Sequence, residues 1–93
     1  MMKLPVALFN WLQIKIVADA RPEDGAAKET VAFFEDILRE DHRLGFVAAE
    51  WSEAEDSYVV TYEQDGAAHS ERFEREEAER LWKDIEANPK YNE

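Results

Sequence analysis

The dipeptide Asp65-Gly66 constrains the fold of this chain more than any other feature, because it is a strong signal for a two-residue β-hairpin. Asp-Gly favours the two-residue turn that joins antiparallel strands, since both positions of that turn need a positive φ. We therefore predict a hairpin with strands over residues 58–63 and 68–73. The turn also sets the register in which the two strands pair.

A third strand extends this hairpin into a sheet. Residues 46–51 are again largely apolar, and the polar segment 52–57 connects them to the hairpin. The predicted pairs are Tyr62 with His69, Val60 with Glu71, Tyr58 with Phe73 and Trp51 with Tyr58. One face of the sheet then collects the larger apolar side chains: Val47, Ala49, Trp51, Tyr58, Val60, Tyr62 and Phe73. We expect the helices to pack on this face, because each helix has an apolar stripe to bury.

The opposite face of the sheet is mixed and built largely from small residues. It carries Phe46, Ala48, Glu50, Val59, Thr61, Glu63, Ala68, Ser70 and Arg72. Small side chains leave room for another segment, either the N-terminal stretch with Phe9 and Trp11 or a second subunit. The candidate interface residues are Phe46, Ala48, Val59, Thr61 and Ser70.

Two helices are predicted from apolar residues at helical spacing. One covers residues 23–42 and the other residues 75–87, which Asn88-Pro89 should end. Their apolar stripes contain Ala27, Val31, Phe34 and Leu38 in the first helix, and Ala78, Leu81, Trp82 and Ile85 in the second.

The N-terminal segment is harder to interpret. Residues 11–18 alternate as in a half-buried strand, and Leu4–Asn10 fits either a short helix or an early start of that strand. A single helix over residues 5–20 is the alternative. On a helical wheel its polar residues scatter, and this favours the strand. The prediction is therefore an α+β fold, β-α-β-β-β-α, with two helices on one face of a small, mostly antiparallel sheet, in a single domain over residues 1–93.

Acidic residues are concentrated in the second half of the chain. The net charge is −11; residues 1–45 carry six basic and eight acidic residues, whereas residues 46–93 carry five and fourteen. No Lys or Arg lies between Arg43 and Arg72. This field repels nucleic acid and anionic membranes and attracts basic surfaces. The candidate partner-binding residues are Glu50, Glu53, Glu55, Asp56 and Glu63.

The order of the predicted elements over residues 23–87 resembles the double-stranded RNA-binding domain in topology. That family meets phosphates with a basic cluster at the start of its last helix. The corresponding segment here reads Glu74-Arg75-Glu76-Glu77, and its charge is of the wrong sign. The resemblance therefore implies a fold and no direct nucleic-acid binding.

Catalytic signals are weak. Tyr62, His69 and Glu71 could together carry acid–base chemistry, but no nucleophile, phosphate-loop or metal-ligand spacing is present. We predict no catalytic residue, no metal site and no cofactor. The chain also lacks cysteine and any apolar run long enough for a membrane span, which favours a cytoplasmic protein.

These observations favour a non-enzymatic interaction or regulatory module that binds a protein partner with a basic surface. A homodimer through the sheet face or an edge strand is a second hypothesis. A nucleic-acid mimic that binds a basic protein, and a small enzyme using His69 and Glu71, are the remaining alternatives.

Overall fold

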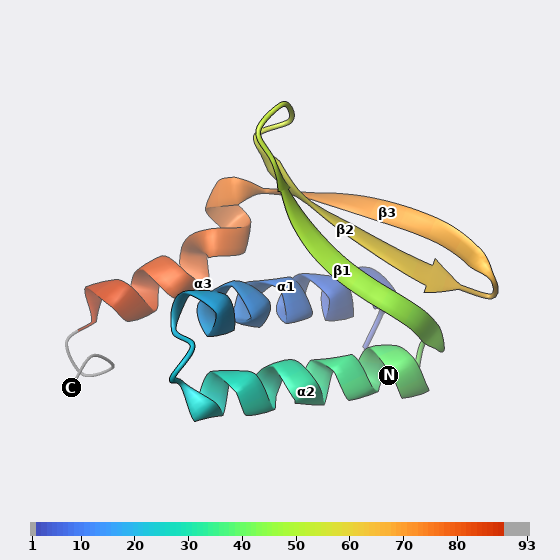
Figure 1. Cartoon of the computed structure of the whole chain (residues 1–93), viewed down its shortest axis with the longest axis horizontal. Helices are drawn as coiled ribbons and strands as arrows, with labels where there is room; N and C mark the ends of the chain where they lie inside the picture. Colours follow the sequence, from blue (N-terminus) through green and yellow to red (C-terminus); the bar gives the residue numbers. More distant parts are fainter. Residues whose placement is uncertain (1, 89–93) are drawn as a thin grey trace.

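The structure is a computed structural model that describes residues 2–88. Its elements are, in chain order, α1 (Leu4–Ala20), α2 (Gly25–Glu40), β1 (Leu44–Ser52), β2 (Ser57–Gln64), β3 (Ala67–Glu74) and α3 (Arg75–Ala87) (Figure 1). The predicted α+β class is confirmed. The predicted strand count is not, because the first element is a helix.

The N-terminal segment forms one continuous helix, so the strand predicted over residues 11–18 is wrong. The scatter of polar residues that argued against a helix has a physical cause. Helix α1 packs against α2, α3 and the sheet at once. A helix covered on several sides has no single solvent face, and its polar residues need not form one stripe. Pro5 lies in the first turn, where its missing N–H costs no hydrogen bond.

The three strands form one antiparallel sheet in the order β1-β2-β3. The predicted pairs of Tyr62 with His69, Val60 with Glu71, Tyr58 with Phe73 and Trp51 with Tyr58 are all confirmed. Asp65 and Gly66 have φ angles of 54° and 79°, the positive values that a two-residue turn of this kind requires. The register of β1 against β2 shifts between Leu44 and Phe46. This bulge lies at the start of the β1 edge.

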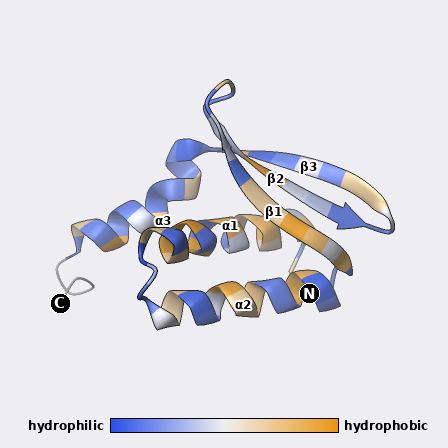
Figure 2. Ribbon diagram, viewed as in Figure 1, coloured by the Kyte–Doolittle hydropathy of each residue, from blue (hydrophilic) through white to orange (hydrophobic). Residues whose placement is uncertain are grey.

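The core lies between α1 and the predicted apolar face of the sheet. Leu8, Leu12 and Val60 are fully buried in it, and Trp11 is 1% exposed. Figure 2 shows the hydrophobic residues gathered along α1 and β1, whereas α3 is more hydrophilic. A second cluster of Val17, Ala18 and Ala27 joins α1 to α2, with Trp82 of α3 packed against it.

Trp51 departs from the predicted core. It is 41% exposed, although the register does place it in the row that faces the helices. It precedes the turn at residues 53–56. Its ring meets Tyr58 edge-on at 5.2 Å, and the guanidinium of Arg75 lies 5.8 Å from the ring centroid.

The N-terminal segment does not cover the opposite face of the sheet. Phe9 packs against Phe73 on the helical side, with ring centroids 5.7 Å apart. Trp11 is buried in the main core, where its indole N–H donates to Glu35 at 3.2 Å. Of the two alternatives for covering the small-residue face, the N-terminal segment is therefore wrong, and a second subunit stays a prediction.

The other two helices agree closely with the prediction. Asp24 caps α2 by accepting a hydrogen bond from the Ala27 N–H at 3.0 Å, so the helix begins two residues later than predicted. It ends at Glu40 and not at residue 42. Helix α3 has the predicted bounds of 75–87; Asn88 follows it as the C-cap, and Pro89 lies outside the described residues.

Candidate protein-interaction surface

The face of the sheet opposite the helices is open in the described chain, as Figure 1 shows, with α1, α2 and α3 all on the other side. The register arranges it in three rows across the strands: Phe46, Glu63 and Ala68; then Ala48, Thr61 and Ser70; then Glu50, Val59 and Arg72. All five candidate interface residues lie here. Phe46 is 55% exposed, Thr61 and Ser70 are exposed, and Ala48 and Val59 are half-buried.

Two of the candidate acids, Glu50 and Glu63, also lie on this open face. Both are exposed, and neither has an ion-pair partner among residues 2–88. Glu50 lies opposite Val59, four positions from Glu63, which corresponds to about 13 Å along a strand. The face therefore presents two separated negative charges, with Phe46 directly opposite Glu63.

Gly45 makes the position of Glu63 possible. A Cβ at this glycine would lie 2.9 Å from Oε1 of Glu63, closer than van der Waals contact allows. The carboxylate therefore leans over bare backbone at the β1 bulge. Any side chain at Gly45 would push it aside.

Two acidic residues of the turn after β1 already have ion-pair partners, which the sequence does not reveal. Glu55 accepts a hydrogen bond from Nη1 of Arg72 at 2.9 Å, and Asp56 lies 3.8 Å from Nη1 of Arg75. These arginines come from β3 and α3, which the fold brings beside the turn. Both pairs are largely exposed and hence weak, but they neutralise two of the three acids. Glu53 is exposed and forms no ion pair within the described chain.

A hydrogen bond between β2 and α3 fixes the helix under this end of the sheet. The Tyr58 hydroxyl donates to Oε2 of Glu79 at 2.6 Å. Burial, followed by this hydrogen bond to a carboxylate, raises the pKa of Tyr58 to about 12.

Tyr62, His69 and Glu71 come close together on β2 and β3. The Tyr62 ring stacks on His69 with centroids 5.3 Å apart, and burial, aided by the charge of Glu71, raises the pKa of the Tyr62 phenol. His69 and Glu71 are exposed on β3. None of the three lines the principal hollows of the described surface. A raised phenol pKa also makes Tyr62 a poorer proton donor at neutral pH.

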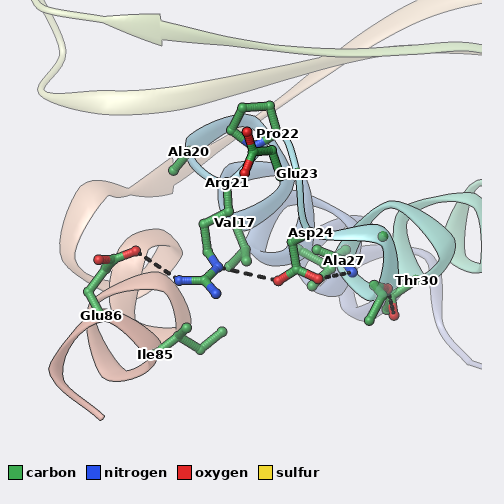
Figure 3. A pocket seen from close by; sticks show the side chains of 13 residues that line it. Val17, Ala20, Arg21, Pro22, Glu23, Asp24, Ala27, Thr30, Ile85 and Glu86 are labelled. Atoms are coloured by element: carbon green, nitrogen blue, oxygen red, sulfur yellow. Dashed lines mark hydrogen bonds and ion pairs between the residues drawn. The ribbon is translucent and has the colours of Figure 1, made fainter. Parts of the chain in front are cut away.

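Sequence reasoning missed an open depression of about 950 Å³ where α1, α2 and α3 meet. Figure 3 shows Arg21 at its centre, between Asp24 and Glu86. The Arg21 guanidinium donates to both carboxylates at 3.3 Å. The Arg21-Pro22 break in the sequence marks this corner. Because acids outnumber the one arginine and Asp24 already occupies the Ala27 N–H, the hollow does not suit an anion.

No three His, Cys, Asp or Glu side chains within residues 2–88 group closely enough to hold a metal ion. No helix in that range has the length and hydropathy of a membrane span.

Comparisons of the chain with protein-family models, with curated proteins and with solved structures found no match.

Proposed function

We propose that this protein is a non-enzymatic interaction module whose open sheet face binds a basic surface on a protein partner. The observation that carries the proposal is the pair Glu50 and Glu63. These are exposed carboxylates without ion-pair partners among the described residues, and they flank small side chains on an uncovered face. A partner would give them Lys or Arg side chains.

Phe46 supports the same proposal. A phenyl ring that is 55% exposed beside Glu63 offers apolar area next to a charge. Interfaces commonly combine an aromatic anchor with a charged rim in this way. The acidic turn is the weaker candidate, since Glu55 and Asp56 already pair with arginines. Because the chain contains no cysteine, we place the module in the cytoplasm.

Affinity capture from extract of the native cell tests the proposal. The immobilised baits are the wild type, an open-face variant with Glu50→Gln and Glu63→Gln, and a control with Glu29→Gln and Glu40→Gln. The control changes the net charge equally, at exposed positions on α2. We expect the open-face variant to lose a captured protein by about tenfold, equivalent to about 1.4 kcal/mol, and the control to retain it.

Salt and a third variant sharpen this experiment. The captured protein should elute as salt rises, because exposed charge pairs are screened. Changing Glu53, Glu55 and Asp56 to Ser separates the turn from the face. If only this turn variant loses the captured protein, the open-face proposal is wrong. Equal losses in the control and the open-face variant would indicate nonspecific charge attraction and would also contradict it.

A further inference from the structure

The outer edge of β3 is the most regular uncovered strand edge in the described chain. Seven of its eight residues are exposed, and only Phe73 is half-buried. Its register against β2 runs without a shift from Ala67 to Glu74, whereas the β1 edge is bulged between Leu44 and Phe46. Natural proteins protect edges with charged side chains, proline or bulges. Strand β3 carries the charged residues Glu71, Arg72 and Glu74 but contains no lysine, no proline and no bulge.

The hairpin turn determines which backbone groups of β3 point outward. In a two-residue hairpin the closing pair, here Gln64 and Ala67, is hydrogen-bonded, and hydrogen-bonded pairs alternate with non-hydrogen-bonded ones along the strands. The N–H and C=O groups of Ala68, Ser70 and Arg72 therefore point away from β2. They form a row of donors and acceptors that suits an added antiparallel strand.

We propose that a second copy of this chain pairs with this edge, β3 against β3, about a two-fold axis at Ser70. In this register Ser70 lies opposite its own copy, and His69 of each copy lies opposite Glu71 of the other. The histidine and the carboxylate make two favourable cross-strand pairs.

The neighbouring registers are worse. Pairing centred on Glu71 would place two carboxylates directly opposite each other, and pairing centred on His69 would place two imidazoles opposite each other. The side chains of β3 are thus complementary to those of a second copy in the register centred on Ser70. The resulting sheet has six strands, and the two open faces lie on the same side of it. This inference does not depend on the proposed function.

The net charge of −11 on each copy opposes this association. A standard stable interface buries roughly 1,600 Å², and we expect one pair of eight-residue strands to bury less. We therefore expect dimers at high micromolar protein and a shift towards dimer as salt screens the repulsion. Binding of a basic partner weakens with salt, so the two proposals respond to salt in opposite directions and their failures are distinguishable.

Cysteine cross-linking tests the register, because the chain has no cysteine of its own. Directly opposite residues of a hydrogen-bonded pair have Cα atoms about 5.5 Å apart, within the range of a disulfide. Oxidation of Ser70→Cys at high micromolar protein should yield mainly covalent dimer. The control is Thr61→Cys, which lies on the same face one strand further in, opposite Ser70. It should cross-link at least about tenfold less, because the two copies of Thr61 each lie one strand spacing of about 4.8 Å further from the two-fold axis than Ser70 does.

Analytical ultracentrifugation of Ser70→Pro tests the backbone contact. The Ser70 N–H points outward, so proline should be tolerated by the hairpin but should block the added strand. We expect the wild type and Ser70→Ala to gain mass with concentration and Ser70→Pro to stay monomeric with an unchanged circular dichroism spectrum. The proposal is overturned by a wild type that stays monomeric, by a Ser70→Pro dimer, or by equal cross-linking of the two cysteine variants. Should Ser70→Pro not fold, the cysteine pair decides alone.

Discussion

Helix α1 and strand β3 are opposites in how they use their residues. Six residues of α1 are buried, and they supply much of both core clusters, whereas no residue of β3 is fully buried. Yet the Asp65-Gly66 turn correctly predicts β3, whereas the residue pattern of α1 wrongly favours a strand. Clear local patterning and contribution to the core are therefore separate properties in this molecule.

The contrast also predicts how stability is distributed. Segments with few buried apolar contacts open at low free energy, whereas core helices exchange only on near-global unfolding. Four predictions, ordered from the largest expected effect to the smallest, test how stability is distributed between the helical core and the β3 edge.

The largest effect is expected from Leu12→Ala in α1. Leu12 is fully buried, and truncating such a leucine costs about 2–5 kcal/mol of unfolding free energy. Urea unfolding followed by circular dichroism measures the loss. Glu29→Ala on the exposed side of α2 is the control and should change the stability by less than about 0.5 kcal/mol. A Leu12→Ala loss within that same limit would contradict the view that α1 holds the core together.

A smaller effect is expected from Tyr58→Phe, which removes the hydrogen bond to Glu79 and should cost about 1 kcal/mol at neutral pH. The stabilisation by this hydrogen bond should also decrease at high pH. The pKa of Tyr58 in the folded state is raised to about 12 from its ordinary 10.0, so folding favours the protonated phenol. The stabilisation is complete below about pH 10 and is lost as pH rises through 12. Thermal unfolding from pH 9 to 12 should show the wild-type advantage over Tyr58→Phe shrinking; a constant difference would contradict this.

The stabilisation by Asp24, which caps α2, should be smaller and should decrease at low pH instead of high pH. Its hydrogen bond from the Ala27 N–H lowers the pKa of the carboxyl below the ordinary 3.8, and the adjacent Arg21 lowers it further. Its contribution is therefore present above about pH 3.8 and is lost as pH falls further. Asp24→Asn keeps a capping side chain, whereas Asp24→Ala does not. Melting temperatures at pH 7 should fall in the order wild type, Asp24→Asn, Asp24→Ala, and the first two should converge in acid.

The smallest effect is expected on β3 itself. Ala68→Ser changes an exposed position on the open face and should alter the unfolding free energy by less than about 0.5 kcal/mol. In dilute wild-type protein, the backbone amides of Ala68 and Ser70 should exchange hydrogen with solvent far faster than the amide of Leu12 does. Slow hydrogen exchange of both amides in a protein shown to be monomeric would contradict the view that β3 opens more easily than α1.

The predictable parts of the fold were those encoded by neighbours in sequence. Asp65-Gly66 determined the hairpin register, and the apolar spacing of α3 gave its bounds, because turn chemistry and helical periodicity act over a few residues. Helix α1 has no single apolar stripe in its sequence, because it is covered by α2, α3 and the sheet, which are distant in sequence. The ion pairs of the acidic turn could not be predicted from the sequence either. Arg72 lies 17 positions after Glu55, and only the completed sheet brings the two together.

The candidate site was predictable as a face but not as a set of free charges. Alternation along the strands placed Phe46, Thr61 and Ser70 on one side, and the confirmed register retains that placement. Which carboxylates lack a partner depends on where arginine side chains reach. Glu50 and Glu63 could not be separated from Glu55 and Asp56 before the fold was known.

The bulge at the start of β1 has a consequence for the size of assemblies. A sheet with two regular edges could pair β3 with β3 at one side and β1 with β1 at the other, and such alternating two-fold contacts would extend into a filament. Here the paired spacing of β1 is broken between Leu44 and Phe46, at the bare backbone of Gly45. A chain with one regular edge and one irregular edge can terminate growth at two copies. If copies pair through β3 as proposed, straightening the β1 edge should allow further copies to add and form fibres.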